Sequence, residues 1–119
     1  MIKSSLIGFS KGIEGDSVFT ARNPATGENL EDSFCHASEE DVAKACNLAS
    51  EASLAMAALS GSKKAGFLRD LSDRLGGIVD QLVQTMTAET GLPEPRVRGE
   101  TGRTISQLKM FADLVESGN

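Results

Sequence analysis

The sequence has no tryptophan, no tyrosine and a single histidine, His36. Its aromatic side chains are five phenylalanines, so the core expected of this chain is aliphatic and rich in alanine. Acidic and basic residues are interspersed, the formal net charge is -5, and lysine and arginine form no run. A groove that follows nucleic-acid phosphates needs clustered positive charge, so the composition argues against a nucleic-acid partner.

Long apolar runs are also absent. The first ten residues, MIKSSLIGFS, hold an apolar run too short for a signal peptide. No window approaches the about 18 consecutive apolar residues of a membrane-spanning helix. We therefore expect a soluble, cytoplasmic protein that has no membrane partner.

Cysteine is scarce, and its spacing excludes the common metal sites. Cys35 and Cys46 are too far apart for a C-x-x-C pair, and His36 cannot supply the missing ligands, so no metal site is predicted. Cys46 falls on the apolar side of a predicted helix, where a buried hydrophobe is expected. Cys35 and His36 are neighbours on a predicted strand, which sends their side chains to opposite faces and disfavours a thiolate–imidazole pair.

The first third of the chain has the pattern of short strands. Residues 5–9 and 17–22 read as the two strands of a hairpin, joined by the polar turn KGIEGD. Asn23-Pro24 and Thr26-Gly27 then supply strong turn chemistry, because proline fixes φ and glycine accepts a positive φ. A short strand follows from Asn29.

Four helices are predicted after residue 37. Ser38 is the expected N-cap of the first, followed by acids at 39–41 that suit the positive end of the helix dipole. Its apolar residues form two faces, which indicates packing on two sides. Ser60-Gly61-Ser62 is expected to stop this helix, and the next begins at about Lys63.

The remaining breaks are marked by glycine and proline. Gly76-Gly77 predicts the end of the second helix, on whose exposed side Asp70 and Arg74 are spaced for an i,i+4 ion pair. A third helix runs to Gly91, and a fourth follows through Ile105. The expected fold is mostly α with a small N-terminal β hairpin, as a single incomplete domain over 1–119 with hairpin and turn in 1–37 and helices in 38–119.

The segment 91–104 has the most unusual composition, with three glycines, two prolines and five charged residues. Guanidinium groups beside flexible backbone suit bidentate binding of a carboxylate. On the residues alone, a solvated connection between two helices is the stronger interpretation. The side chains and glycines concerned are Arg96, Arg98, Gly99, Glu100, Gly102 and Arg103.

Three stretches in order carry a family resemblance: ARNPATGE at 21–28, ETGLP at 89–93 and GETGRTISQLKMFADL at 99–114. Together they resemble the N-terminal portion of the aldehyde dehydrogenase superfamily. The last stretch is similar to the branch that oxidises α-ketoglutarate semialdehyde (2,5-dioxopentanoate), with the NADP-preferring fatty-aldehyde branch as the alternative. The resemblance covers essentially this whole chain but only the leading minority of the family's length.

The resemblance implies the leading part of a cofactor-binding domain, a partial α/β fold. It implies an enzyme in which a cysteine thiolate attacks an aldehyde, hydride passes to NAD or NADP, and a glutamate activates water. Those catalytic residues and the cofactor turn belong to later segments of the family, so neither Cys35 nor Cys46 is assigned the catalytic role. The chain alone is therefore expected to be inactive and to bind no cofactor.

The resemblance also implies partners and one candidate site. The expected partner is the remainder of an aldehyde dehydrogenase chain or a second copy, and full-length relatives are expected to be homo-oligomers. Gly99, Glu100 and Arg103 are expected near the mouth of the substrate tunnel, where Arg103 attracts the carboxylate of an acidic semialdehyde. The alternative is a non-enzymatic helical interaction module that binds another chain through the exposed faces of its first and last helices.

Overall fold

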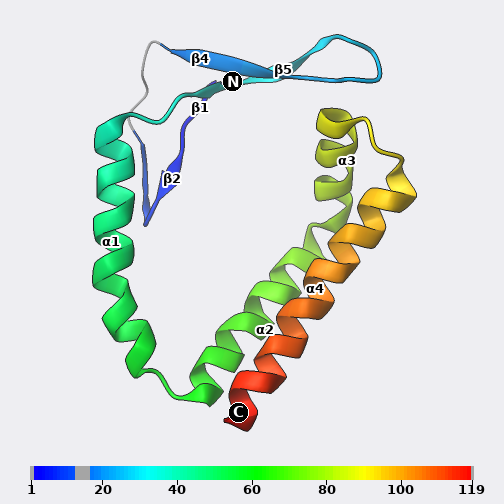
Figure 1. Ribbon diagram of the computed structural model, residues 1–119. Helices are drawn as coiled ribbons and strands as arrows, with labels where there is room; N and C mark the ends of the chain where they lie inside the picture. The colour runs from blue at the N-terminus through cyan, green and yellow to red at the C-terminus, as the bar shows by residue number, and fades with distance from the viewer. Residues whose placement is uncertain (1, 13–16, 119) are drawn as a thin grey trace. The chain divides into compact units, whose positions relative to one another are not determined.

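The structure is a computed structural model that describes residues 2–12 and 17–118. The chain divides into two compact units, Met1–Ala57 and Ala58–Asn119. The first unit holds short strands and helix α1, and the second holds helices α2, α3 and α4 (Figure 1). The mostly helical fold with a small β part agrees with the prediction from the sequence. A single domain over 1–119 stays a prediction.

Among the described residues of the first unit, five short strands form two small sheets. β5 is the central strand of one sheet, where β1 pairs with it in parallel and β4 pairs with it antiparallel. β2 and β3 form a separate antiparallel hairpin whose turn contains Gly8 at φ 60°. The strands are β1 (Ile2–Lys3), β2 (Leu6–Ile7), β3 (Ser10–Lys11), β4 (Val18–Arg22) and β5 (Asn29–Cys35).

The predicted hairpin partner of residues 17–22 is wrong, because β4 pairs with β5. The turn between them closes through two backbone hydrogen bonds of 2.8 Å, from Asn23 N to Glu28 O and from Gly27 N to Asn23 O. Gly27 has φ 77°, as the turn chemistry predicted. The turn at 23–28 closes through its own backbone hydrogen bonds, so it pairs β4 with the strand that follows it and not with the strand that precedes it. Part of the predicted KGIEGD turn, 13–16, lies outside the described residues.

Helix α1 spans Glu39–Ala58 and begins as predicted. Ser38 Oγ accepts a hydrogen bond from Asp41 N at 3.0 Å, and the Asp41 carboxylate accepts one from Ser38 N at 3.4 Å. This reciprocal cap leaves Asp41 5% exposed. Every later residue of the helix, Val42 to Ala58, is exposed. The apolar faces of α1 that predicted two-sided packing are therefore not covered by their own unit.

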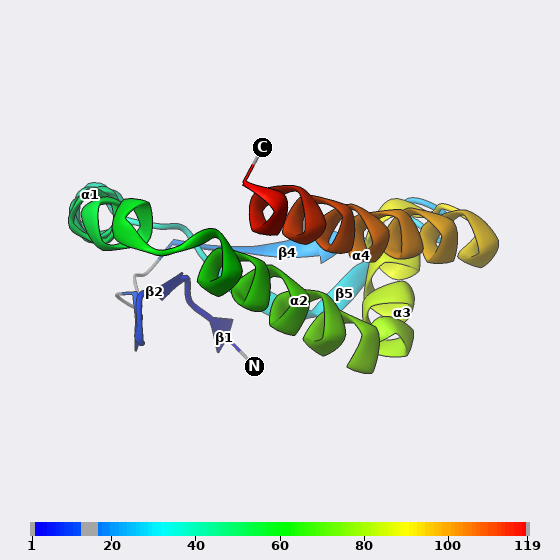
Figure 2. The ribbon, with the colours of Figure 1, turned by 90° about the horizontal axis from the view of Figure 1, so that it is seen from below.

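Helix α2 spans Gly61–Gly77, and its start was predicted two residues late. Ser60 caps this helix, because its hydroxyl accepts a hydrogen bond from Lys63 N at 3.3 Å. Helix α4 lies beside α2 (Figure 2). At Gly61 the two backbones approach so closely that an added Cβ would lie 2.3 Å from Val115 O. A glycine is thus required where these helices cross.

Helix α3, Val79–Thr90, is separated from α2 by Ile78. The break falls one residue after the predicted Gly76-Gly77, and both glycines stay in α2. Ile78 has φ -121° and ψ 16°, which interrupts the helical path. The helix ends as predicted at Gly91, which has φ 68° and donates its N–H to Thr87 O at 2.9 Å.

Helix α4 spans Glu94–Ser117, so most of the predicted connection at 91–104 is helical. Pro93 is the N-cap, and a proline in the first turn removes no helical hydrogen bond. Two glycines cost a helix interior about 2 kcal/mol relative to alanine. Burial of Val97 (1% exposed) and Thr101 (7% exposed) against the neighbouring helices offsets that cost. The composition of 91–104 predicted a loop, but tertiary packing stabilises a helix from Glu94 onward.

The interior of the second unit is small and aliphatic, as the composition predicted. Ala65 and Ala112 are fully buried, and Val83 is 2% exposed. The Ser72 hydroxyl, which is also fully buried, donates to Ile105 O at 3.1 Å and joins α2 to α4. Small residues let the helix axes come close, and the satisfied hydroxyl avoids a desolvation penalty.

Candidate functional site

The candidate residues Gly99, Glu100 and Arg103 lie on one side of α4. Gly99 and Arg103 are spaced i,i+4, and Glu100 and Arg103 are spaced i,i+3, so each pair is adjacent on the helix surface. Arg103 and Gly99 are exposed, and Glu100 is half-buried. The structure therefore brings the three predicted residues together, on a helix and not on a flexible loop.

The arginines of this segment differ in their partners. Arg96 donates from Nε to Glu100 Oε1 at 3.1 Å. Arg98 donates to Glu94 at 2.8 Å and to Asp80 of α3 at 2.9 Å, and these hydrogen bonds raise the pKa of its guanidinium. Arg98 thus joins α3 to α4. Arg103 makes no ion pair with any residue that the structure describes, so its hydrogen-bond donors are available to a ligand.

A hollow of about 200 Å³ lies between the three helices beside Glu100. Its threonine hydroxyls are already used, since Thr101 donates to Val97 O at 3.0 Å and Thr104 donates to Glu100 O at 3.1 Å. The hollow is therefore apolar apart from one carboxylate, which suits a short aliphatic chain. Its lining is Leu75, Leu82, Met86, Glu100, Thr101 and Thr104.

A second charged cluster joins α2 to the end of α4. Arg69 donates to Glu116 at 2.6 Å and to Asp113 at 2.7 Å. The hydrogen bond from Arg69 holds the pKa of the Glu116 carboxyl below its ordinary value. Lys109 and Asp73 form a looser pair at 3.7 Å nearby. Because every charge here has an opposite partner across the helix pair, this cluster stabilises packing and offers no reactive group.

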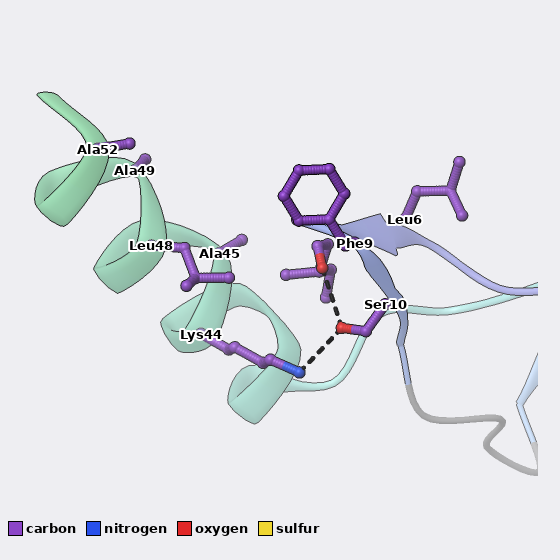
Figure 3. A pocket seen from close by; sticks show the side chains of 10 residues that line it. Leu6, Phe9, Ser10, Lys44, Ala45, Leu48, Ala49 and Ala52 are labelled. Atoms are coloured by element: carbon purple, nitrogen blue, oxygen red, sulfur yellow. Dashed lines mark hydrogen bonds between the residues drawn. The ribbon is translucent and has the colours of Figure 1, made fainter. Parts of the chain in front are cut away.

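The first unit has an apolar groove of about 710 Å³ between the β2–β3 hairpin and α1. At one end Lys44 Nζ donates to Ser10 Oγ at 3.1 Å, and Ser10 Oγ donates to Ile7 O at 3.0 Å (Figure 3). The groove holds no acid and no nucleophile other than this engaged hydroxyl. Its other lining residues are Leu6, Gly8, Phe9, Ala45, Leu48, Ala49 and Ala52.

The two cysteines occupy different environments. Cys35 ends β5 and is 7% exposed. Cys46 is exposed, so the prediction of a buried hydrophobe is wrong, because nothing in its own unit covers that side of α1. The His36 ring lies 4.9 Å from the Phe19 ring and is exposed.

The described residues do not fit a nicotinamide dinucleotide by themselves. A pyrophosphate binds where a glycine-rich turn leads from a strand into a helix N-terminus. The one helix that directly follows a sheet strand is α1, and it opens with acids at 39–41, which repel phosphate. Within 2–12 and 17–118, no three metal-binding side chains gather, and no helix is long and apolar enough to cross a membrane.

Comparison with known proteins identifies the class. The model of the aldehyde dehydrogenase family matches residues 12–119. The chain therefore belongs to the aldehyde dehydrogenase family, as the motifs in the sequence predicted. The solved aldehyde dehydrogenase 21 of Physcomitrella patens, in complex with the reaction product succinate, is 25% identical with a TM-score of 0.83 over 94% of this chain and 23% of that one.

Two of the relatives that the chain resembles are named as semialdehyde dehydrogenases. Alpha-ketoglutaric semialdehyde dehydrogenase 2 of Azospirillum brasilense is 37% identical over 114 residues, 95% of this chain and 22% of that protein. 5-carboxymethyl-2-hydroxymuconate semialdehyde dehydrogenase of Escherichia coli is 30% identical over 110 residues, 92% of this chain and 23% of that protein. The chain thus spans about a fifth of the length of these relatives. An NAD-dependent aldehyde dehydrogenase of Sinorhizobium meliloti shares the fold, with a TM-score of 0.82 at 21% identity over 98% of this chain and 24% of that one.

Sequence reasoning missed three features of the site. The Arg96–Glu100 pair follows from i,i+4 spacing once α4 is known to begin at Glu94. The Arg98–Asp80 pair joins residues 18 apart on different helices, and no local pattern indicates it. The apolar lining supplied by α2 and α3 likewise depends on tertiary packing.

Proposed function

We propose that these 119 residues form the N-terminal part of an NAD(P)-dependent aldehyde dehydrogenase that oxidises an acidic semialdehyde, such as α-ketoglutarate semialdehyde, to a carboxylic acid. Alone they are inactive and bind no cofactor, because the groups that perform the chemistry lie in the remainder of the enzyme. The location is the cytoplasm. The fatty-aldehyde branch is the alternative substrate class.

The observation that carries the substrate class is the unpaired guanidinium of Arg103 on α4. Arg96 and Arg98 each satisfy an acid on their own or a neighbouring helix, whereas Arg103 is exposed without an ion pair among the described residues. A guanidinium presents donors in a fork that matches a carboxylate. The relatives named for semialdehydes of carboxylic acids support the same class.

The partner of the chain is the remainder of the aldehyde dehydrogenase polypeptide, and the assembled enzyme is a homo-oligomer. Large apolar side chains of α1 support this, since Leu54 is 78% exposed and Val42 is 55% exposed. Each unburied Å² of apolar area forgoes about 25 cal/mol. A surface of this kind marks an interaction site in a stable protein.

The test replaces the matched segment of the Azospirillum enzyme with this chain, and it compares α-ketoglutarate semialdehyde with pentanal, a neutral aldehyde of equal length. Arg103→Ala should raise KM for the acidic aldehyde by about tenfold, from loss of a hydrogen bond to a charged group, and leave KM for pentanal nearly unchanged. Arg98→Ala is the control for loss of another arginine from α4; it also removes the pairs with Glu94 and Asp80, so any effect it has should be equal for the two aldehydes. Equal effects of Arg103→Ala on both aldehydes would contradict the proposed substrate class.

A non-enzymatic helical interaction module is the second candidate, and the exposed apolar faces of α1 favour it as much as they favour an enzyme segment. The coding sequence downstream of Asn119 separates the two. A reading frame, continuing or frameshifted, that encodes a catalytic cysteine motif supports the dehydrogenase. A stop codon followed by an unrelated gene supports the module.

A further inference from the structure

A charged stripe on α4 surrounds the candidate residues. Arg96, Glu100 and Arg103 are spaced i, i+4 and i+7, so they follow one another along one side of the helix. Neighbours at this spacing have Cβ atoms about 5–6 Å apart. Glu100, which lines the apolar hollow, thus has an arginine one turn before it and another one turn after it along the helix, and Arg96 is the one that pairs with it.

The carboxylate in this stripe is a difficulty for an acidic substrate. Glu100 lines the hollow, and Arg103 is its neighbour, so an incoming carboxylate would meet a negative charge next to the group that attracts it. Arg96 removes this difficulty, because its Nε donates to Glu100 Oε1 at 3.1 Å from the preceding turn. The pair is half-exposed, with 66% and 45% of the two side chains accessible, so its effect on a nearby ligand is modest.

Gly99 lies between the two guanidinium groups on the same side of the helix, three residues after Arg96 and four before Arg103. Beyond Gly99, its two chain neighbours and the nearby backbone of α4, no heavy atom lies within 4 Å of where its Cβ would be. A carboxylate can therefore approach Arg103 over the bare backbone at Gly99, where a larger side chain would hold it away. The stripe has a net positive charge, because it holds two arginines and one carboxylate, and Arg96 is the arginine that pairs with Glu100.

We propose that Arg96 is a specificity-determining residue of this enzyme, which masks the charge of Glu100 so that Arg103 can receive the carboxylate of the substrate. This inference rests on the proposed function. Arg96 acts through Glu100 and does not itself hold the substrate. Arg96 affects the preference of the enzyme for acidic over neutral aldehydes and has no effect on the chemical step.

The experiment is a double-mutant cycle in the chimeric enzyme, with KM measured for α-ketoglutarate semialdehyde and pentanal. Arg96→Ala should raise the ratio of the two KM values, acidic over neutral, by about two- to fivefold, the range of one exposed charge pair. In the Glu100→Gln background the same substitution should change nothing, because no charge remains to be masked. Arg96→Lys should keep most of the wild-type ratio, and the effect of Arg96→Ala should fall on KM for the acidic aldehyde and not on kcat.

Two results would overturn the inference. An unchanged ratio in Arg96→Ala would remove any role for this residue, and an equal rise with and without Glu100 would make Arg96 a direct substrate contact. The proposed function fails separately, if Arg103→Ala affects both aldehydes equally. If the chimera is inactive, the same variants are tested in the 119-residue chain by NMR. Each variant is titrated with glutarate, and the shift of the Arg103 Nε–H signal is measured. Pentanol is the neutral control ligand. No difference between wild type and Arg96→Ala in that titration would also overturn the inference.

Discussion

Replacing Gly61 with alanine tests the contact on which the packing of α2 against α4 depends. The added Cβ would lie 2.3 Å from Val115 O and 3.3 Å from Val115 C, distances that only a backbone movement can relieve. Overpacking of this kind costs about 1–3 kcal/mol. Alanine favours a helix over glycine by up to about 1 kcal/mol, and by less in the first turn. The difference between these two terms is a net loss of up to about 3 kcal/mol, with about 1–2 kcal/mol expected because the gain is small in the first turn.

Gly66→Ala in the same helix is the matched control, since nothing lies within 4 Å of its added Cβ. That substitution should gain about 0.5–1 kcal/mol from backbone entropy. In thermal unfolding of the 119-residue chain followed by circular dichroism, Gly61→Ala should lower Tm by about 4–8 °C per kcal/mol, whereas Gly66→Ala should raise it. The reasoning about the close crossing is refuted if both substitutions raise Tm.

Three further predictions concern capping, pH and solubility. Ser38→Ala removes the acceptor for the Asp41 N–H and should cost about 1 kcal/mol, seen as faster hydrogen exchange at that amide; unchanged exchange would argue against the cap. Because Arg69 depresses the pKa of Glu116, the stability from this pair is present above the unfolded pKa of about 4.3 and lost as the pH falls below it. The drop in Tm from about pH 5 to about pH 3 should therefore be larger in the wild type than in Arg69→Met, and equal drops would contradict this. The chain should self-associate in sedimentation velocity and Leu54→Lys should reduce this, whereas a concentration-independent monomer with a sharp thermal transition would oppose the account.

Local signals predicted the ends of several elements correctly. The Ser38 cap, the Gly27 turn and the Gly91 stop each depend on neighbours within a few residues, and each was found where the sequence placed it. The order of the helices was predicted from the same kinds of residue, the capping serines and the glycines and prolines at the helix ends. The chemistry at these positions is set by φ or by an unpaired N–H, so sequence alone is sufficient.

Other features depended on tertiary contacts and were missed. The start of α4 at Glu94 was missed because its glycines indicate a loop, and burial of Val97 outweighs that preference. The exposure of Cys46 was missed because periodicity identifies an apolar face without showing what covers it. At the site, the grouping of Gly99, Glu100 and Arg103 followed from family motifs, but the hollow beside them needed α2 and α3 in place.

The most direct test of the account compares the purified 119-residue chain with the chimeric enzyme in which it replaces the matched segment of the Azospirillum dehydrogenase. The measurement is reduction of NAD or NADP with α-ketoglutarate semialdehyde present. We predict no reduction by the chain alone and steady turnover by the chimera. Turnover by the isolated chain would contradict the claim that its chemistry resides in the rest of an aldehyde dehydrogenase.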